Sequence, residues 1–336
     1  MSNIKDVAQR AGVSVPTAYK ALGGTYYTSP EICNKVFAAA EELGYVHKAS
    51  KINGESSDKV IAIVLDEIIN PFYSNMVKEM SKELENLGYR LIVMYSNNNQ
   101  ACEKADFELI LKHKINGAIF IPSFETNEDT IRHMIVSKFP MLQLFRDVYN
   151  GVDTLLIDDE LGAYLAVQYL IQNGHRKIML IAKTHPSLVK REKGYMKAFE
   201  EAGISYDSNW LYLMNYDNCT KAMIKQKIHE ISPTAILSVG ENIGTNVIQS
   251  LNEMNLSIPD DVSLISYDDF AWTATYGITA IAHSYESIGR LAAQMMHARF
   301  MDMGEKNRKS AERLILDPYL ISRNSVKILG GRKDEK

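Results

Sequence analysis

The sequence contains little cysteine and no long apolar segment, and both absences narrow the class of protein. Its three cysteines, Cys33, Cys102 and Cys219, are far apart and form no C-x-x-C pair, so we expect neither a disulfide framework nor a zinc site. No apolar run approaches the length of a membrane span, and we expect no membrane partner. The polar N-terminus leads directly into a helical pattern, without the features of a signal peptide. These absences together predict a protein of the reducing cytoplasm.

The common catalytic signatures are also missing. There is no G-x-S-x-G elbow, no H-E-x-x-H, no Walker A loop and no G-x-G-x-x-G after a strand. The eight histidines do not cluster at the spacing of metal ligands. We therefore expect no cofactor and no metal, and a binding protein rather than an enzyme. The formal net charge of −4 is not typical of a nucleic-acid-binding chain, although residues 1–51 are mildly basic.

Two short helical patterns meet across a glycine close to the N-terminus. Gly12 suits a tight turn that needs a positive φ, and Ser14 is a good N-cap for the second helix. The apolar faces of the two helices are formed by Ile4, Val7, Ala8 and Ala11, and by Ala18, Ala21 and Leu22. Two helices joined by a short turn with glycine are typical of the helix-turn-helix motif, whose second helix enters the major groove of DNA.

A third helix and a polar segment complete the N-terminal region. Thr28 and Ser29 offer N-caps, Pro30 suits the first turn, and Gly44 suits the C-terminal end. The apolar stripe of this helix is Ile32, Val36, Ala39, Ala40 and Leu43. We predict a DNA-binding headpiece over 1–46, a linker over 47–58 and a core over 59–336.

From residue 60 onward, β-rich runs alternate with amphipathic helical patterns, which predicts an α/β core of parallel sheets. The strand candidates are Val60–Leu65, Arg90–Tyr95, Ala118–Ile121, Met141–Phe145, Ile178–Ala182, Ala235–Val239, Val262–Ser266, Arg313–Leu316 and Tyr319–Ile321. The helical candidates include Tyr73–Leu87, Cys102–Lys112, Leu161–Gln172, Lys190–Ala202, Ile243–Met254 and Ser287–Met301. We predict two lobes, the first about 59–157 plus 285–316 and the second about 158–284 plus 317–330.

The loops after the predicted strands contain the candidate ligand-binding groups, because ligands of open α/β sheets bind beyond the carboxyl ends of the strands. Aromatic rings, arginines and acidic side chains there suit a small polyhydroxylated or planar ligand. The candidates are Phe72, Tyr73, Asn97–Asn99, Arg146, Arg191, Glu241, Asp268 and Asp269. Each candidate also has an alternative role without a ligand. The two aromatics could pack in the core, Arg191 could be a surface cation, the Asp doublet could cap a helix and the asparagines could form a turn. Likewise, Tyr19 either covers the small core or contacts a sugar-phosphate, and Lys20 is either solvated or contacts DNA.

Motifs along most of the chain resemble the lac repressor–galactose repressor family of bacterial transcription regulators. The opening I-K-D-V-A-x-x-A-G-V-S-V-x-T over Ile4–Thr17 is similar to the headpiece signature of that family. Further similar motifs are Ala40-x-x-Leu43-Gly44-Tyr45, Asn70-Pro71-Phe72-Tyr73, Gly117-Ala118-Ile119, Gly174-His175-Arg176-Lys177-Ile178, Gly194-Tyr195, Pro259–Ser263, Tyr267-Asp268-Asp269 and Arg323-Asn324-Ser325.

The resemblance implies a helix-turn-helix headpiece, a hinge and a two-lobed core like that of periplasmic sugar-binding proteins. It also implies a homodimer that binds a double-stranded, pseudo-palindromic operator and responds to a small-molecule effector, a sugar or sugar derivative. The DNA-binding residues implied are Ser14, Val15, Pro16, Thr17, Tyr19 and Lys20, with Val15, Pro16 and Lys20 at the bases. The effector-binding residues implied are Phe72, Tyr73, Arg191, Tyr216, Asp268 and His283, and the loops after the strands add Arg146 and Glu241 to the predicted effector site.

Three departures from the family pattern affect these expectations. Phe145 stands where the family has an Asp before the Arg of the fourth strand, and Gly240-Glu241 replaces an Asn-Asp pair. The hinge has Lys51-Ile52-Asn53-Gly54 where the family has Ala-Arg-x-Leu, and glycine disfavours a helix by about 1 kcal/mol against alanine. Two rival hypotheses follow: a ligand-binding module with weakened DNA binding, and an enzyme with Asp268 or Glu241 as its base.

Overall fold

The computed structural model describes residues 3–22, 29–45, 59–125, 128–184, 188–214, 220–302 and 310–329. The chain divides into two compact units, Met1–Ser57 and Asp58–Lys336. The predicted linker, residues 47–58, and Tyr216 lie outside the described residues. Within these ranges, no helix combines the length and the hydrophobicity that a bilayer span requires.

The first unit contains the predicted helix-turn-helix and third helix: α1 (Ile4–Arg10), α2 (Val15–Leu22) and α3 (Pro30–Glu42). Gly12 has φ +66° in the turn, and the Ser14 hydroxyl accepts a hydrogen bond from the Thr17 amide at 3.2 Å. Ser29 caps α3 as predicted. The core of this first unit is built from small side chains, Val7, Ala8, Ala18, Ala21, Val36, Ala39 and Ala40.

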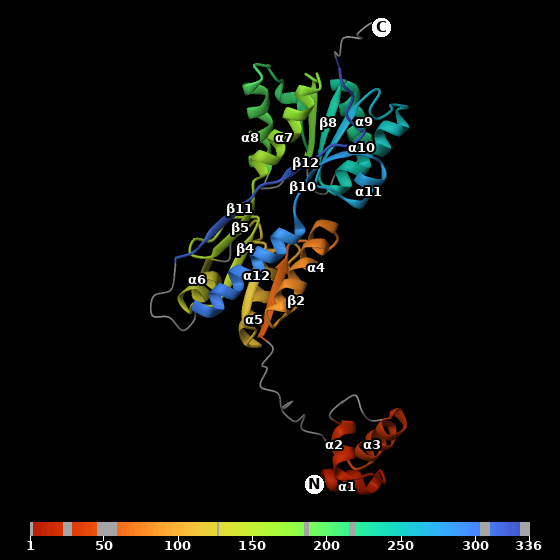
Figure 1. The fold of residues 1–336 in the computed structure, drawn as a ribbon, viewed down its shortest axis with the longest axis vertical. Coiled ribbons are helices and arrows are strands. Elements are labelled where there is room, and N and C mark those ends of the chain that lie inside the picture. Colours follow the sequence, from red (N-terminus) through yellow and green to blue (C-terminus); the bar gives the residue numbers. More distant parts are fainter. Residues whose placement is uncertain are drawn as a thin grey trace. The chain divides into compact units, whose positions relative to one another are not determined.

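The second unit contains two six-stranded sheets, which define two lobes (Figure 1). Lobe 1 has the strand order β11-β5-β4-β3-β1-β2, with all neighbours parallel. Lobe 2 has the order β12-β10-β9-β8-β6-β7, and only its β10–β12 pairing is antiparallel. The fold class is the predicted one: a helix-turn-helix domain followed by a two-lobed α/β core.

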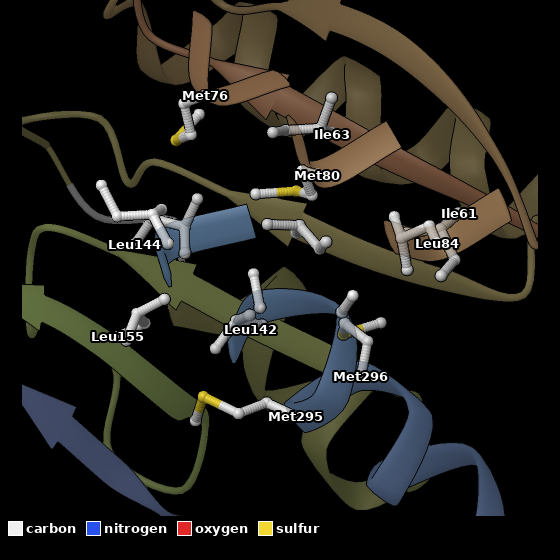
Figure 2. Close-up of a cluster of buried hydrophobic side chains, with 14 of the residues drawn as sticks. Ile61, Ile63, Met76, Met80, Leu84, Leu142, Leu144, Leu155, Met295 and Met296 are labelled. Carbon is white, nitrogen blue, oxygen red and sulfur yellow. The ribbon is translucent and has the colours of Figure 1, made fainter. Parts of the chain in front are cut away.

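The elements of lobe 1 come from two stretches of the chain. They are β1 (Lys59–Leu65), α4 (Pro71–Asn86), β2 (Tyr89–Tyr95), α5 (Gln100–Lys112), β3 (Gly117–Phe120), α6 (Glu128–Val136), β4 (Met141–Leu144), β5 (Asp153–Ile157), α12 (Tyr285–Asp302) and β11 (Arg313–Leu316). Figure 2 shows the core that joins these stretches, in which side chains of β1, α4, β4 and β5 converge on Met295 and Met296 of α12.

Lobe 2 takes the middle of the chain and one late strand. Its elements are α7 (Asp159–Gln172), β6 (Ile178–Lys183), α8 (Leu188–Glu201), the 3₁₀ helix η1 (Ser208–Trp210), β7 (Leu211–Met214), α9 (Lys221–Ile231), β8 (Ala235–Val239), α10 (Glu241–Glu253), β9 (Ser263–Tyr267), α11 (Ala271–Thr275), β10 (Thr279–Ala282) and β12 (Tyr319–Ile321). The described chain passes between lobes after β5, after β10 and after β11, so the carboxyl ends of β5 and β10 face the other lobe (Figure 1).

Three strands were absent from the sequence prediction, each for a physical reason. The buried strand β5 begins with Asp153, whose charge is balanced by an ion pair with Arg299 of α12. The edge strand β7 is short and only partly buried, and β10 consists of Thr279, two alanines and one isoleucine. A short strand with few large apolar side chains is hard to distinguish from the loops around it by hydrophobicity.

Candidate functional site

A cavity of about 180 Å³ lies at the carboxyl ends of the strands of both lobes. This is where ligands bind in open parallel sheets. Of the eight predicted effector residues, seven line it together: Phe72, Tyr73, Arg146, Arg191, Glu241, Asp268 and His283. Tyr216 lies outside the described residues.

On the lobe 1 side, the cavity wall is organised by a buried ion pair between Arg146, after β4, and Asp66, after β1. The Arg146 guanidinium also donates to the Pro122 carbonyl and to Asn98 Oδ1, and it lies 4.6 Å from the ring centre of Phe124. Only 6% and 7% of the two side chains of the pair are exposed. Arg146 is therefore held in one position, while the second carboxylate oxygen of Asp66 is buried without a hydrogen-bond partner.

Three aromatic rings form the apolar part of the same wall. Phe145 has φ +62°, and its ring packs edge-to-face with Phe72 at 5.3 Å and stacks with Tyr73 at 6.4 Å between centroids. Phe72 is both a core residue and a cavity residue, so the two interpretations of this aromatic pair are compatible. Burial raises the pKa of Tyr73 well above its ordinary value, and the charge of Asp66 adds to the rise.

On the lobe 2 side, Arg191 of α8 pairs with Asp159, the first residue of α7, at 2.8 Å. Its guanidinium lies 4.1 Å from the ring centre of Tyr267, whose hydroxyl donates to Asp159 Oδ1 at 3.1 Å. Burial opposes the charge of Arg191, but the negative charge of Asp159 and further groups outweigh it and hold the pKa above its ordinary value. Arg191 is thus a fixed cation of the cavity rather than a surface cation.

The acidic doublet after β9 divides its two side chains between different partners. Asp268 has φ +81° and pairs with Nε2 of His283 at 2.9 Å, inside the cavity. Asp269 forms two hydrogen bonds with Arg323, at 2.7 and 2.9 Å. Asp268 is therefore available to a ligand, whereas Asp269 ties the C-terminal segment to lobe 2.

Two further carboxylates approach the cavity from opposite lobes. Glu67 follows β1, and Glu241 is the first residue of α10, directly after Gly240 with φ +103°. Burial raises the pKa of Glu241, and the negative charge of Glu67 raises it further. The cavity therefore contains an acidic region besides its two arginine–aspartate pairs.

The candidate DNA-contacting face lies on α2 in the first unit. Ala18 and Ala21 are buried against α1 and α3, which leaves the opposite side of α2 exposed. Thr17 is partly buried, and the exposed predicted residues are Ser14, Val15, Pro16, Tyr19 and Lys20. Tyr19, with 45% of its surface exposed, is thus not a core residue of the headpiece.

The sequence analysis missed Asp66, Asp159 and Tyr267 as cavity residues or their supports. Asp66 directly follows β1, and Asp159 begins α7 just after β5. Their position at the carboxyl end of a strand was the sequence signal that could have identified them. Their pairing with arginines far along the chain depends on the order of strands in the sheets. No group of three or more His, Cys, Asp or Glu side chains suited to a metal ion occurs in the described ranges.

A helix-turn-helix unit joined to a two-lobed, cavity-containing core defines a ligand-responsive DNA-binding regulator. Two family patterns match the chain: residues 3–48 match "Bacterial regulatory proteins, lacI family", and residues 167–326 match "Periplasmic binding protein-like domain". The chain belongs to the lacI family of bacterial regulatory proteins.

Relatives agree with this assignment, and solved structures agree with the fold. The chain is 27% identical to the HTH-type transcriptional repressor PurR of Histophilus somni, covering 98% of this chain and all of that protein. It is 26% identical to the regulator DegA of Bacillus subtilis, covering 97% and 98%. The fold is similar to that of the transcriptional regulator CelR in its cellobiose complex, with a TM-score of 0.69, 22% identity, and coverage of 97% and 100%. A LacI family regulator from Enterococcus faecium with bound ribose has a TM-score of 0.69, 23% identity, and coverage of 81% and 100%.

Proposed function

We propose that this regulator is a homodimeric repressor whose operator affinity is controlled by a small hydroxylated effector, a sugar or sugar derivative, bound in the cavity. The observation that carries the proposal is the cavity itself, where two buried arginine–aspartate pairs from different lobes flank an aromatic wall. Fixed charged donors and acceptors beside aromatic rings suit the hydroxyls and the apolar face of a sugar ring.

The proposed DNA contacts are those of α2. Lys20 offers donors to guanine, and Val15 offers an apolar contact to a thymine methyl group. Pro16 and Val15 donate no side-chain hydrogen bond, so this helix recognises bases with few polar contacts. Ser14, Thr17 and Tyr19 are proposed to contact the sugar-phosphate backbone, which positions the helix without specifying sequence.

The effector acts, in this proposal, by favouring one arrangement of the lobes over another. A ligand changes a conformational equilibrium only if it binds the two states with different affinity. Arg146 and Asp66 belong to lobe 1, whereas Arg191 and Asp268 belong to lobe 2, so a ligand that contacts both sets depends on the distance between the lobes. Cellobiose and ribose in the two similar solved structures support a sugar as the class of ligand.

A homodimer is supported by the exposed edge of lobe 1. The edge strand β2 presents Ile92, Val93 and Tyr95 with 37%, 47% and 53% of their surfaces exposed. Exposed apolar side chains on an open sheet edge are typical of a protein contact. A two-fold dimer also matches a two-fold operator.

The proposal is tested by measuring two variants in two assays, one for DNA binding and one for ligand binding. Binding sites are selected from genomic fragments with the full chain, and ligands are screened by thermal shift with sugars, sugar phosphates and nucleobases. We expect Lys20→Ala to lose the selected DNA site and keep the ligand shift. We expect Arg191→Met to keep the DNA site and lose the ligand shift. A wild-type chain that prefers no fragment, with or without ligands, would contradict the proposed function.

A further inference from the structure

The wall of the effector cavity contains a strained aromatic residue, Phe145. Eight non-glycine residues of the described chain have a positive φ, and Phe145, at +62°, is the one with an aromatic ring. A bulky side chain rarely adopts this left-handed conformation, which glycine adopts without strain. The conformation is held because the Phe145 amide donates to the Leu155 carbonyl at 2.8 Å and the Arg146 amide donates to the Leu144 carbonyl at 2.7 Å. Backbone strain is concentrated at functional sites, and here it belongs to a ring that lines the cavity.

Apolar side chains line the cavity from both lobes. Those of lobe 1 belong to one hydrophobic cluster, and they are Phe72, Tyr73, Ile121, Phe145 and Ile157. Those of lobe 2 are Val239, at the end of β8, and Ile243 of α10. A ligand in the cavity therefore meets apolar side chains on two sides, not only at the aromatic wall.

Most of the charged side chains in the cavity already have partners within the protein. The pairs are Asp66 with Arg146, Asp159 with Arg191, and Asp268 with His283. These pairs form the polar part of the cavity, where hydroxyls of a ligand find donors and acceptors. A hydroxyl placed against the apolar side chains would be buried without a partner, which is unfavourable.

A free monosaccharide fits this distribution only in part. Its hydroxyls surround the ring, so it has at most one largely apolar face and covers the apolar side chains of one lobe. An aromatic ring is apolar on both faces and packs favourably against other aromatic rings. From the strained Phe145 ring and the apolar lining of both lobes, we infer that the effector is a sugar with an aromatic substituent, as in aryl glycosides and nucleosides, and that this substituent lies against Phe145.

The inference rests on the proposed function, because it concerns the ligand of the same cavity. It also gives the aromatic substituent a role in regulation. A ring that contacts Phe145 of lobe 1 and Val239 of lobe 2 loses one of these contacts when the lobes separate. The substituent therefore binds one arrangement of the lobes more tightly than the other, which is the condition for control by a ligand.

The test compares matched ligands on the full chain by calorimetry. Phenyl β-glucoside and phenyl β-galactoside are titrated against their methyl counterparts, and adenosine and uridine against methyl β-riboside. Cyclohexyl β-glucoside and cyclohexyl β-galactoside are the apolar controls without an aromatic ring. We expect at least one aromatic ligand to bind about tenfold or more tightly than its methyl counterpart, because the ring buries apolar surface and pairs with Phe145. A preference confined to the phenyl glycosides identifies an aryl glycoside, and one confined to adenosine or uridine identifies a nucleoside.

The Phe145→Leu variant tests the contact itself. Leucine keeps a bulky apolar side chain but has no aromatic ring, so the sugar part of the ligand should bind as before. We expect the aromatic ligand to bind about threefold or more weakly than to the wild type, with the affinity of its methyl counterpart unchanged. The control is Tyr276→Leu, which removes an aromatic ring that is 66% exposed and does not line the cavity, and both affinities should stay the same.

The outcomes separate this inference from the proposed function. Methyl or cyclohexyl glycosides that bind as tightly as the aromatic ligands would overturn the inference, even where Phe145→Leu does not fold. An aromatic preference that is unchanged in a folded Phe145→Leu chain would also overturn it, and so would the failure of every aromatic ligand to bind. If ligands without an aromatic ring then change the affinity for the selected DNA site, the proposed function stands without the inference. If the chain selects no DNA site, the proposed function fails whichever ligand binds.

Discussion

The headpiece and the cavity present their candidate binding groups in opposite ways. On α2 these groups are mostly exposed and stand on a core of valine and alanine side chains. In the cavity, Arg146, Asp66, Arg191 and Asp159 are largely buried and paired with one another. Loss of an exposed charged side chain changes stability little, whereas loss of one partner of a buried ion pair is costly because it leaves the other charge buried and unpaired.

The difference separates two kinds of functional residue. In the headpiece, loss of a side chain proposed to contact bases, such as Lys20, should leave stability unchanged, because the scaffold is held by other residues. In the cavity, the groups that bind the ligand also join the loops of different strands, so binding and stability should change together. The four predictions below test this contrast.

The largest effect is expected for Arg146→Ala. The substitution leaves the Asp66 carboxylate buried without its cation, and loss of one partner of a buried pair costs about 3–5 kcal/mol. The matched control is Arg90→Ala, which removes an exposed pair with Glu85 and should cost about 0–1 kcal/mol. Urea unfolding of both variants measures the difference. Equal shifts of the two midpoints would show that the buried pair has no special structural role.

The opposite behaviour is expected for Lys20→Ala in the headpiece. Loss of a base contact should weaken binding to the selected DNA site by about 1–3 kcal/mol, with binding to scrambled DNA much less affected. The unfolding midpoint should not change, because Lys20 is exposed. Lys35→Ala, which removes an exposed lysine of α3 paired with Glu31, is the control. An equal loss on specific and scrambled DNA would remove Lys20 from the base-contacting residues.

The contrast also explains how much could be predicted from sequence. The headpiece is made of contacts between residues close in the chain, and its turn glycine, its buried face and the caps at Ser14 and Ser29 were predicted, whereas the Asn3 cap of α1 was not. The βα alternation likewise predicted two lobes with helices beside parallel strands. Local periodicity is sufficient for such features because each element is specified by its own residues.

The arrangement of the cavity could be predicted only in part. The loops after the strands were identified as ligand-binding, and seven of the predicted residues lie there. The acid partners were not identified, since Asp66 and Arg146 are 80 residues apart and meet only because β1 and β4 both flank β3. Such a pairing depends on strand order, for which no local pattern exists.

A smaller effect is expected for Ser14→Ala at the start of α2. The Ser14 hydroxyl accepts the Thr17 amide, and removal of such a cap costs about 1 kcal/mol. Hydrogen exchange of the headpiece amides in the full chain should become about fivefold faster. The amides of the second unit are the internal control and should not change. Unchanged exchange in α2 would show that the cap is not needed for its stability.

The smallest effect concerns the two glutamates at opposite ends of α10. The pKa of Glu241 is raised in the folded chain, chiefly by burial, so the ionised form disfavours folding. The stability that its protonated form contributes is present below the unfolded value of about 4.5 and is lost as pH rises through the raised folded pKa. We therefore expect Glu241→Gln to melt above the wild type at pH 7, by no more than about 2 °C, and to lose this advantage at pH 4.

Glu253 provides the control of opposite sign on the same helix. Hydrogen bonds with Lys221 and Lys225 lower its pKa to about 2, so its ionised form favours folding above the unfolded value and this contribution fades as pH falls toward 2. Glu253→Gln should consequently melt slightly below the wild type at pH 7, by less than the Glu241 effect because the side chain is exposed. Thermal melts of both variants between pH 4 and pH 8 measure the two slopes. Slopes of the same sign would contradict the raised pKa of Glu241, which burial and the charge of Glu67 produce.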